Sequence, residues 1–321
     1  MKKRFEGRIS SQRPEQWDER TKENELLRSA VLEAAAHSDT PFLYVEHPAY
    51  ICCEYKMKLN IFTFGKLRLR IPMTVVGLPA SFDKSGFSGS IGALAADYQN
   101  RGGLALLLNL ESTHGLPAQA AVGETLCSCI FYNRFSSFEE YERSLRSGYR
   151  RRIHIADAKG ADLRLARIPP EDYSDETHTL YLNVYRRSKY PLEELRKEFF
   201  RTLDAEIYVF YHGGVQAAFF CIKEYQESLH FVFGGMDYAL RDRFDLYYNM
   251  LIAIIRIGIS RGCHTIDLGQ TAEDTKCRLG CVTEKRYMAL LCRSRATAFI
   301  LRRLAPLLAY RPATKAYNVY K

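Results

Sequence analysis

The chain has 321 residues, enough for two domains of ordinary size or one large one, and 47% of them are hydrophobic. This composition is typical of a globular protein and excludes a chain that is disordered throughout. The net charge of +9 is unevenly placed, because the stretch from Lys276 to the C-terminus holds eleven Lys or Arg against one acid, Glu284. Such a basic end predicts a face that meets phosphates or an anionic surface, although a solvated helix face has the same pattern.

The sequence shows no targeting segment and no metal motif. Its start, MKKRFEGRIS, is basic but lacks the apolar run of a secretion signal, and the longest apolar stretches are too short to span a membrane, so we expect a cytoplasmic protein. The nine cysteines are odd in number and do not indicate a disulfide framework. Cys263, His264, Cys277 and Cys281 are the metal candidates, but without paired C-x-x-C motifs we expect no metal site.

The first half of the chain reads as a helix followed by a mostly stranded region. Its predicted helices cover residues 14–38 and 93–101. Its predicted strands cover residues 42–47, 49–59, 61–77, 102–111 and 126–135. The loop over residues 81–92, before the second helix, is rich in Gly and Ser.

The second half alternates long helices with a strand-rich middle. Its predicted helices cover residues 137–159, 175–203 and 245–261 and a basic C-terminal segment. Its predicted strands cover residues 161–168, 206–212, 215–223, 229–237, 263–269 and 285–292. Gly213 and Gly214 indicate a tight hairpin between two of these strands. An antiparallel meander, a long helix and then a further strand indicate an α+β fold.

Four segments in chain order carry a family resemblance. They are "YERSLRSGYRRRIHIADAKG", "GGVQAAFFCIKEYQESLHFVFGGMD", "FDLYYNMLIAIIRIGISRGCHTIDLG" and "IDLGQTAEDTKCRLG". Together they resemble the GNAT superfamily of acyltransferases, and more narrowly the branch that includes the Fem-type (FemAB-like) peptidyltransferases. The likeness implies two GNAT-like domains with mixed, mostly antiparallel sheets flanked by helices and a cleft between them. Residues 1–134 would form the acceptor side, and residues 135–321 the donor side with a basic C-terminal helix.

The resemblance also implies an activity, the transfer of an acyl or aminoacyl group to an amine. The co-substrate would be acyl-CoA, a carrier-protein thioester or an aminoacyl-tRNA, with no tightly bound cofactor. Typical members hold coenzyme A on a Gly-rich turn before the long helix, whereas "MDYALRDRFDLYYN" has no such turn, which makes a tRNA or carrier-protein donor credible. The alternative is a non-catalytic module that binds RNA or an anionic membrane through the basic C-terminal region.

Acyl transfer to an amine needs donors for the developing oxyanion and a group that takes the amine proton. In the family the acyl group lies between two splayed strands, which by analogy are "LHFVFGG" and "TIDLG", with N–H groups of residues 232–234 facing the carbonyl. Asp237 or His230 would act as the base, and Tyr247 or Tyr248 as the acid. The alternatives are that each tyrosine only packs in the core and that His230 is a hydrogen-bonded strand residue with no catalytic role.

The polar stretch after the last central strand is the main candidate for binding a phosphate. Gln270 and Thr271 follow the strand, and Thr271 with Asp274 has the spacing of a capping box, which predicts a short helix ending before Gly280. On such a helix Lys276 would point away from the cap and could reach a diphosphate. The alternative is a capped turn with a solvated lysine.

Two further groups are candidates for ligand binding. Arg151, in the middle of three consecutive arginines, could reach a phosphate, although a solvated helix face explains the run almost as well. Tyr50, Glu54 and Lys56 are our prediction for the acceptor side, on loop composition and family analogy only.

Overall fold

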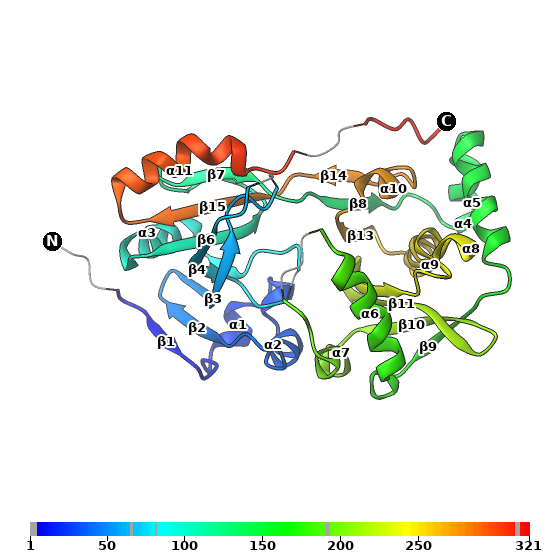
Figure 1. Ribbon diagram of the computed structural model, residues 1–321, viewed down its shortest axis with the longest axis horizontal. Coiled ribbons are helices and arrows are strands. Elements are labelled where there is room, and N and C mark those ends of the chain that lie inside the picture. The colour runs from blue at the N-terminus through cyan, green and yellow to red at the C-terminus, as the bar shows by residue number, and fades with distance from the viewer. Residues whose placement is uncertain (1–4, 65–66, 81, 190–192, 312–314) are drawn as a thin grey trace. The chain divides into compact units, whose positions relative to one another are not determined.

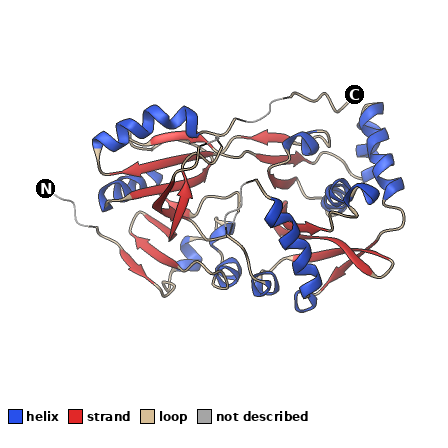
Figure 2. Ribbon diagram, in the orientation of Figure 1, coloured by secondary structure: helices blue, strands red, loops and turns tan. Residues whose placement is uncertain are grey.

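The computed structural model describes residues 5–64, 67–80, 82–189, 193–311 and 315–321 (Figure 1). The chain divides into two compact units, Met1–Cys127 with Lys285–Pro312 and Ser128–Glu284 with Ala313–Lys321. Each unit holds one mixed sheet flanked by helices, which confirms the predicted α+β class (Figure 2). Among the described residues, no helix is long and apolar enough to cross a membrane.

The first unit is built on a sheet in the order β1-β2-β3-β4-β6-β15-β7, with β5 beside β3. Its strands are β1 (Arg8–Ser10), β2 (Phe42–His47), β3 (Tyr50–Asn60), β4 (Arg70–Val76), β5 (Phe87–Gly89), β6 (Leu104–Leu110), β7 (Ala121–Glu124) and β15 (Tyr287–Cys292). Its helices are α1 (Trp17–Arg20), the 3-10 turn η1 (Glu25–Leu27), α2 (Ser29–Ala35), α3 (Ile91–Arg101) and α11 (Arg295–Leu308). β4 and β6 run parallel, and the other pairs are antiparallel.

Both faces of this first sheet are buried. Side chains alternate along a strand, so Val75 and Val76 of β4 point to opposite faces. Val76 joins the apolar cluster under α3, and Val75 joins the cluster under α11. This double burial explains why the sequence of β6, LALLLNL, is apolar at successive positions rather than alternating.

The single helix predicted over residues 14–38 is wrong, because this stretch folds as three short pieces. Thr21 Oγ1 donates to the carbonyl of Trp17 at 2.8 Å. The side chain of Asn24 then accepts from the N–H of Leu26 and starts η1. Local side-chain hydrogen bonds of this kind compete with a continuous helix, and apolar spacing alone does not reveal them.

The second unit is built on a sheet in the order β14-β8-β13-β12-β11-β10-β9. Its strands are β8 (Ser128–Tyr132), β9 (Arg164–Ile168), β10 (Glu206–His212), β11 (Val215–Tyr225), β12 (Ser228–Met236), β13 (Thr265–Gln270) and β14 (Val282–Glu284). Its helices are α4 (Phe138–Ser144), α5 (Ser147–Lys159), η2 (Pro170–Asp172), α6 (Asp175–Arg187), α7 (Lys197–Thr202), α8 (Arg241–Phe244), α9 (Leu246–Ser260) and α10 (Glu273–Cys277). β12 and β13 run parallel, and the other pairs are antiparallel.

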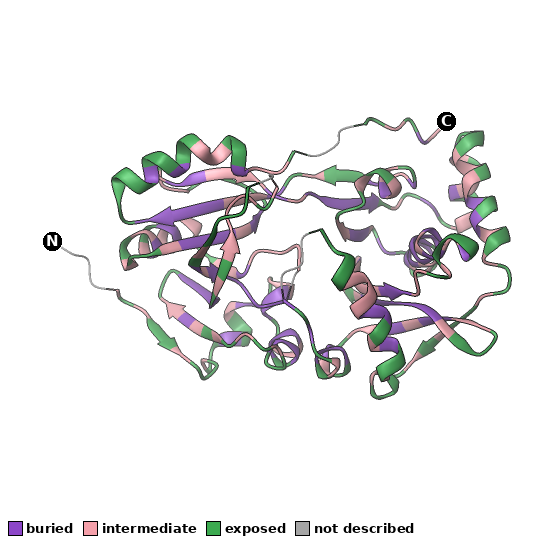
Figure 3. Cartoon of the chain, viewed as in Figure 1, coloured by how far each residue is buried: buried purple, intermediate pink, exposed green. Residues whose placement is uncertain are grey.

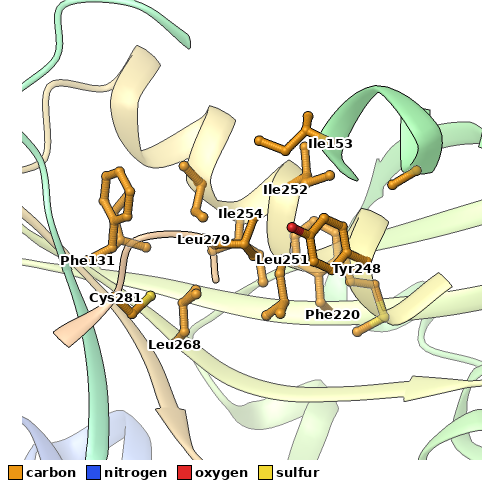
Figure 4. Close-up of a cluster of buried hydrophobic side chains, with 14 of the residues drawn as sticks. Phe131, Ile153, Phe220, Tyr248, Leu251, Ile252, Ile254, Leu268, Leu279 and Cys281 are labelled. Carbon is orange, nitrogen blue, oxygen red and sulfur yellow. The ribbon is translucent and has the colours of Figure 1, made fainter. Parts of the chain in front are cut away.

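Helix α9 forms the centre of the second core. Its side chains pack with those of the sheet beneath it, as Figure 4 shows for Leu251, Ile254, Phe220 and Leu268. At Gly258 an added Cβ would lie 2.4 Å from the Cδ1 of Ile266, so the helix approaches β13 without a side chain between them. Figure 3 shows α9 buried along most of its length.

The predicted domain boundary at residues 134 and 135 differs from the division in the structure. β8, assigned to the first half, pairs with β13 and β14 of the second sheet. Conversely, β15 pairs with β6 and β7 of the first sheet, and α11 packs on β7, so residues 285–312 belong to the first unit. The chain therefore returns to its first unit near the end, a long-range pairing that local sequence patterns do not encode.

Candidate active site

The two parallel strands at the middle of the second sheet separate partway along their length. β12 and β13 pair at Ser228–Thr265, Leu229–Ile266 and His230–Asp267. Within the described residues no later position of β12 is paired with β13, although β12 stays paired with β11 as far as Met236. We call this opening the β12/β13 fork. The ladder between the two parallel strands therefore ends at His230 and Asp267, while β12 itself continues.

The backbone of β13 turns away at Gly269. The carboxylate of Asp267 accepts from the N–H of Gly269 at 2.8 Å, and Gly269 adopts φ 73°. Pairing with β8 also shifts register between Asp267 and Gln270. Thr271 and Ala272 then both lie in the left-handed region, at φ 63° and 53°. This conformation is unfavourable for residues with a Cβ and is found disproportionately at functional sites.

His230 and Asp267 lie side by side at the base of the fork. His230 Nδ1 is 3.8 Å from Asp267 Oδ2, and their side chains are 13% and 3% exposed. Their neighbours Leu229 and Ile266 face Gly258 on α9, so strand alternation directs His230 and Asp267 to the opposite face of the sheet. At 3.8 Å the carboxylate accepts no hydrogen bond from the ring, but its charge favours a protonated imidazole, which suits a general base.

Asp237, the other predicted base, belongs to a different place. It follows the far end of β12, where its carboxylate accepts from the N–H of Ala239 at 2.8 Å and its own N–H donates to Ala217. It lies seven positions after His230, which corresponds to about 23 Å of extended chain at roughly 3.3 Å per residue. The structure therefore does not bring the two predicted bases together.

The two predicted tyrosines follow one another in the first turn of α9 but have different surroundings. Tyr248 is 4% exposed, burial raises its pKa to about 12, and its hydroxyl has no hydrogen-bond partner among the described residues. Figure 4 shows it among apolar side chains that include Ile252 and Phe220. Tyr247 is partly buried; burial raises its pKa, and the nearby charge of Lys276 acts against that shift. Tyr247 is therefore the tyrosine on the side of β13 and α10.

Lys276 is buried, contrary to the exposed position expected for a phosphate ligand. It is 1% exposed, and its Nζ donates to the carbonyl oxygens of Gln270 at 2.7 Å and Gly269 at 3.1 Å. The capping box is also wrong, because Ala272 stands at the N-cap of α10 and no side chain caps the helix. The predicted short helix itself forms, and Gly280 follows it at φ 94°. Lys276 thus holds the end of β13 in place.

Arg152, rather than Arg151, reaches the start of α9. Arg151 is exposed on α5, whereas Arg152 pairs with Asp245 at 2.5 Å and lies 3.9 Å above the ring of Tyr248. Asp245 is the N-cap of α9 and is left-handed at φ 51°. A carboxylate and its arginine therefore stand at this helix start, where the sequence lacks a Gly-rich turn. The run of three arginines does not show by itself which one faces inward.

The three residues predicted for the acceptor side do not form one site. Tyr50 and Glu54 are buried in β3 and bonded to α3: the Tyr50 hydroxyl donates to Asp97 at 2.5 Å, and Arg101 donates to Glu54 at 2.8 Å. Tyr98 also donates to Glu54. Lys56, further along β3, is exposed. Tyr50 and Glu54 thus belong to an internal polar network that joins a strand to a helix.

Comparisons with known proteins agree with this architecture. Residues 143–276 match the family model described as an acetyltransferase (GNAT) domain. No protein of curated function matches the sequence. Three solved structures have a similar fold. The C-terminal domain of a protein described as a lysylphosphatidylglycerol synthetase from Agrobacterium fabrum has a TM-score of 0.56 at 12% identity, covering 90% of this chain and 95% of its own.

The other two structures cover a similar share of the chain. L-PGS from Bacillus licheniformis has a TM-score of 0.55 at 14% identity and covers 92% of this chain and 98% of its own. FemX has a TM-score of 0.52 at 9% identity and covers 92% and 100%. At these identities the likeness concerns the fold. The family match and the parallel strands that separate at His230 and Asp267 lead to one conclusion: residues 143–276 form a GNAT-type acetyltransferase domain.

Proposed function

We propose that the protein transfers an acyl or aminoacyl group from an activated donor to an amine, with the donor carbonyl bound in the β12/β13 fork. One observation carries this proposal: in a GNAT-type domain, β12 loses its pairing with β13 after His230 while it remains paired with β11. The family resemblance assigns the donors to the developing oxyanion to backbone N–H groups within residues 232–234, which follow this last paired position. Such preorganised donors stabilise an oxyanion without reorganising during the reaction.

His230, which lies beside the Asp267 carboxylate, is the proposed base. The amine nitrogen attacks the carbonyl carbon, a C–N bond forms, and the carbonyl electron pair moves onto oxygen. The amine proton passes to the His230 imidazole, whose positive charge the Asp267 carboxylate stabilises from 3.8 Å. The bond to the leaving group then breaks, and its electron pair leaves with the donor sulfur or oxygen.

Tyr247 is the proposed acid that protonates this leaving group. It comes from α9, which packs on the face of the sheet opposite His230, so the base and the acid approach the carbonyl from different sides. Burial raises its pKa, so it keeps its proton at neutral pH. Tyr248, one residue later, lies beneath Arg152 and is the less suitable of the two.

An aminoacyl-tRNA is the proposed donor. The start of α9, where related enzymes hold coenzyme A, carries the carboxylate of Asp245, which repels a diphosphate. The names of two structures with this fold, lysylphosphatidylglycerol synthetase and FemX, point towards aminoacyl rather than acetyl chemistry. A carrier-protein thioester would also avoid the start of α9, and acyl-CoA is the donor that this geometry favours least. We propose that no cofactor is tightly bound.

Hydroxylamine, a minimal amine, allows a test without knowledge of the natural acceptor. Purified protein is incubated with hydroxylamine and either a pool of labelled aminoacyl-tRNAs or labelled acetyl-CoA, and hydroxamate formation is compared with that in samples lacking protein. We expect faster hydroxamate formation with aminoacyl-tRNA, and loss of the enhancement in His230→Ala. Product from acetyl-CoA alone would refute the proposed donor. Absence of product from either donor, with RNA binding retained, would favour the non-catalytic module.

A further inference from the structure

Helix α11 of the first unit exposes large apolar side chains on its outer face. Its inner side packs Ala298, Leu301 and Leu308 against the sheet, where β7 and β15 are its neighbours. At 100° per residue, Phe299, Ile300 and Leu307 fall on the opposite side, and they are 59%, 56% and 60% exposed. Single exposed apolar residues are ordinary, but three on one face of one helix are not.

Arginines stand between these apolar side chains. Arg295, Arg302 and Arg303 are exposed on the same helix, and the Arg303 guanidinium lies 5.2 Å from the Phe299 ring centre. Arg303 falls near the middle of the outer face, between Phe299 and Leu307 in helical angle. The sequence contains no Asp or Glu after Glu284, so nothing on α11 offsets this charge.

The connection between β3 and β4 presents the same combination of residues. Leu67 and Leu69 are 65% and 49% exposed, and Arg68 and Arg70 next to them are exposed as well. The Phe64 ring packs edge-on against the ring of Tyr310, which lies two residues beyond α11; the ring centres are 5.1 Å apart. We call these two segments together the basic apolar face; its members are Leu67, Arg68, Leu69, Arg70, Phe299, Ile300, Arg302, Arg303 and Leu307.

We propose that the basic apolar face binds an anionic phospholipid surface. Aliphatic side chains can enter the boundary between headgroups and acyl chains, while neighbouring arginines bind lipid phosphates. Nucleic acid would leave Ile300, Leu307, Leu67 and Leu69 in water, because aliphatic groups do not stack on bases. The proposal does not depend on the transfer reaction.

Vesicle co-sedimentation with the full chain tests it. We expect binding to vesicles that contain phosphatidylglycerol, weak binding to pure phosphatidylcholine, and loss of binding as salt is raised. The triple variant Phe299→Ser, Ile300→Ser, Leu307→Ser and the double variant Arg302→Glu, Arg303→Glu should each weaken binding about tenfold or more. The altered side chains are exposed, so circular dichroism should show both variants folded.

Matched controls come from the second unit. Val215→Ser removes an apolar side chain that is 59% exposed, as Phe299 is, and Arg186→Glu reverses an exposed arginine. Neither should change vesicle binding. Hydroxamate formation should be unaltered in all four variants, which separates failure of this proposal from failure of the proposed function. Absence of binding to phosphatidylglycerol vesicles, equal binding by the parent and the α11 variants, or selective binding of RNA would overturn the proposal.

Discussion

The ammonium of Lys276 is bonded to the carbonyl oxygen of Gln270 at 2.7 Å and is enclosed by the protein. It also reaches Gly269, so one side chain from α10 satisfies two carbonyl groups just past the point where β13 leaves the sheet. Lys276 thereby stabilises the turn at one side of the β12/β13 fork. These two bonds and its burial give Lys276 a structural role at the end of β13.

Replacing Lys276 with Met should therefore reduce the free energy of unfolding. The variant removes the donor that two partly buried carbonyl groups share, and we expect a loss of about 2–4 kcal/mol in chemical denaturation. Arg278→Ala is the matched control, since it removes an exposed cation from the end of the same helix and should cost less than about 1 kcal/mol. Unchanged stability together with a raised, salt-dependent KM would return Lys276 to the role of a phosphate ligand.

His230→Ala and Asp237→Asn discriminate between the two predicted bases. If His230 takes the amine proton, His230→Ala should lower kcat by about 10²- to 10⁴-fold with little change in KM. Asp267→Asn should also lower kcat, because the imidazolium loses its neighbouring charge. Asp237→Asn, at the other end of β12, should leave kcat within a few-fold of the parent. The reverse pattern, with the large loss in Asp237→Asn, would move the reaction away from the base of the fork.

Ionisation of the buried Tyr248 should reduce the stability of the folded protein at alkaline pH. Burial raises its pKa to about 12 in the folded state against about 10 when unfolded, so folding favours the protonated phenol. This contribution is fully present below pH 10 and is lost as the pH rises towards 12, by on the order of 2 kcal/mol. Tyr248→Phe should therefore match the parent at neutral pH, because the hydroxyl lacks a hydrogen-bond partner among the described residues, and should exceed it in stability above pH 10. Equal alkaline stability in denaturant titrations would contradict this.

Asp245 offers a test of donor selection. Asp245→Gly removes the carboxylate at the start of α9, releases Arg152, and places glycine at a left-handed position, so stability should change by no more than about 1 kcal/mol. We expect calorimetry to show no binding of coenzyme A to the parent and measurable binding to the variant. Tight binding of coenzyme A to the parent would show that the carboxylate does not exclude it. Arg151→Ala, on the exposed side of α5, is the control and should change neither result.

The sequence by itself determined the local secondary structure in several places. The Gly213–Gly214 pair forms the predicted hairpin, because both residues adopt positive φ, which glycine accepts without strain. Residues 206–268 form one mixed sheet, as the alternation of strand, helix and strand predicted. The sequence patterns of this hairpin and these strands span a few residues each. Such a local pattern is enough to predict structure where residues that are close in the chain are also close in space.

Tertiary structure decided the rest, because it depends on residues far apart in the chain. β15 joins the first sheet, although it follows β14 of the second by two residues, since its partners β6 and β7 lie more than 160 positions earlier. His230 and Asp267 meet only through the register of two parallel strands. The polar groups of "GQTAEDTK" suggested a ligand, yet the left-handed turn at Thr271 and Ala272 directs Lys276 back onto the strand. The order of residues shows that a lysine lies close to the end of that strand. Only the folded backbone shows that its ammonium donates to the carbonyl groups of Gly269 and Gln270.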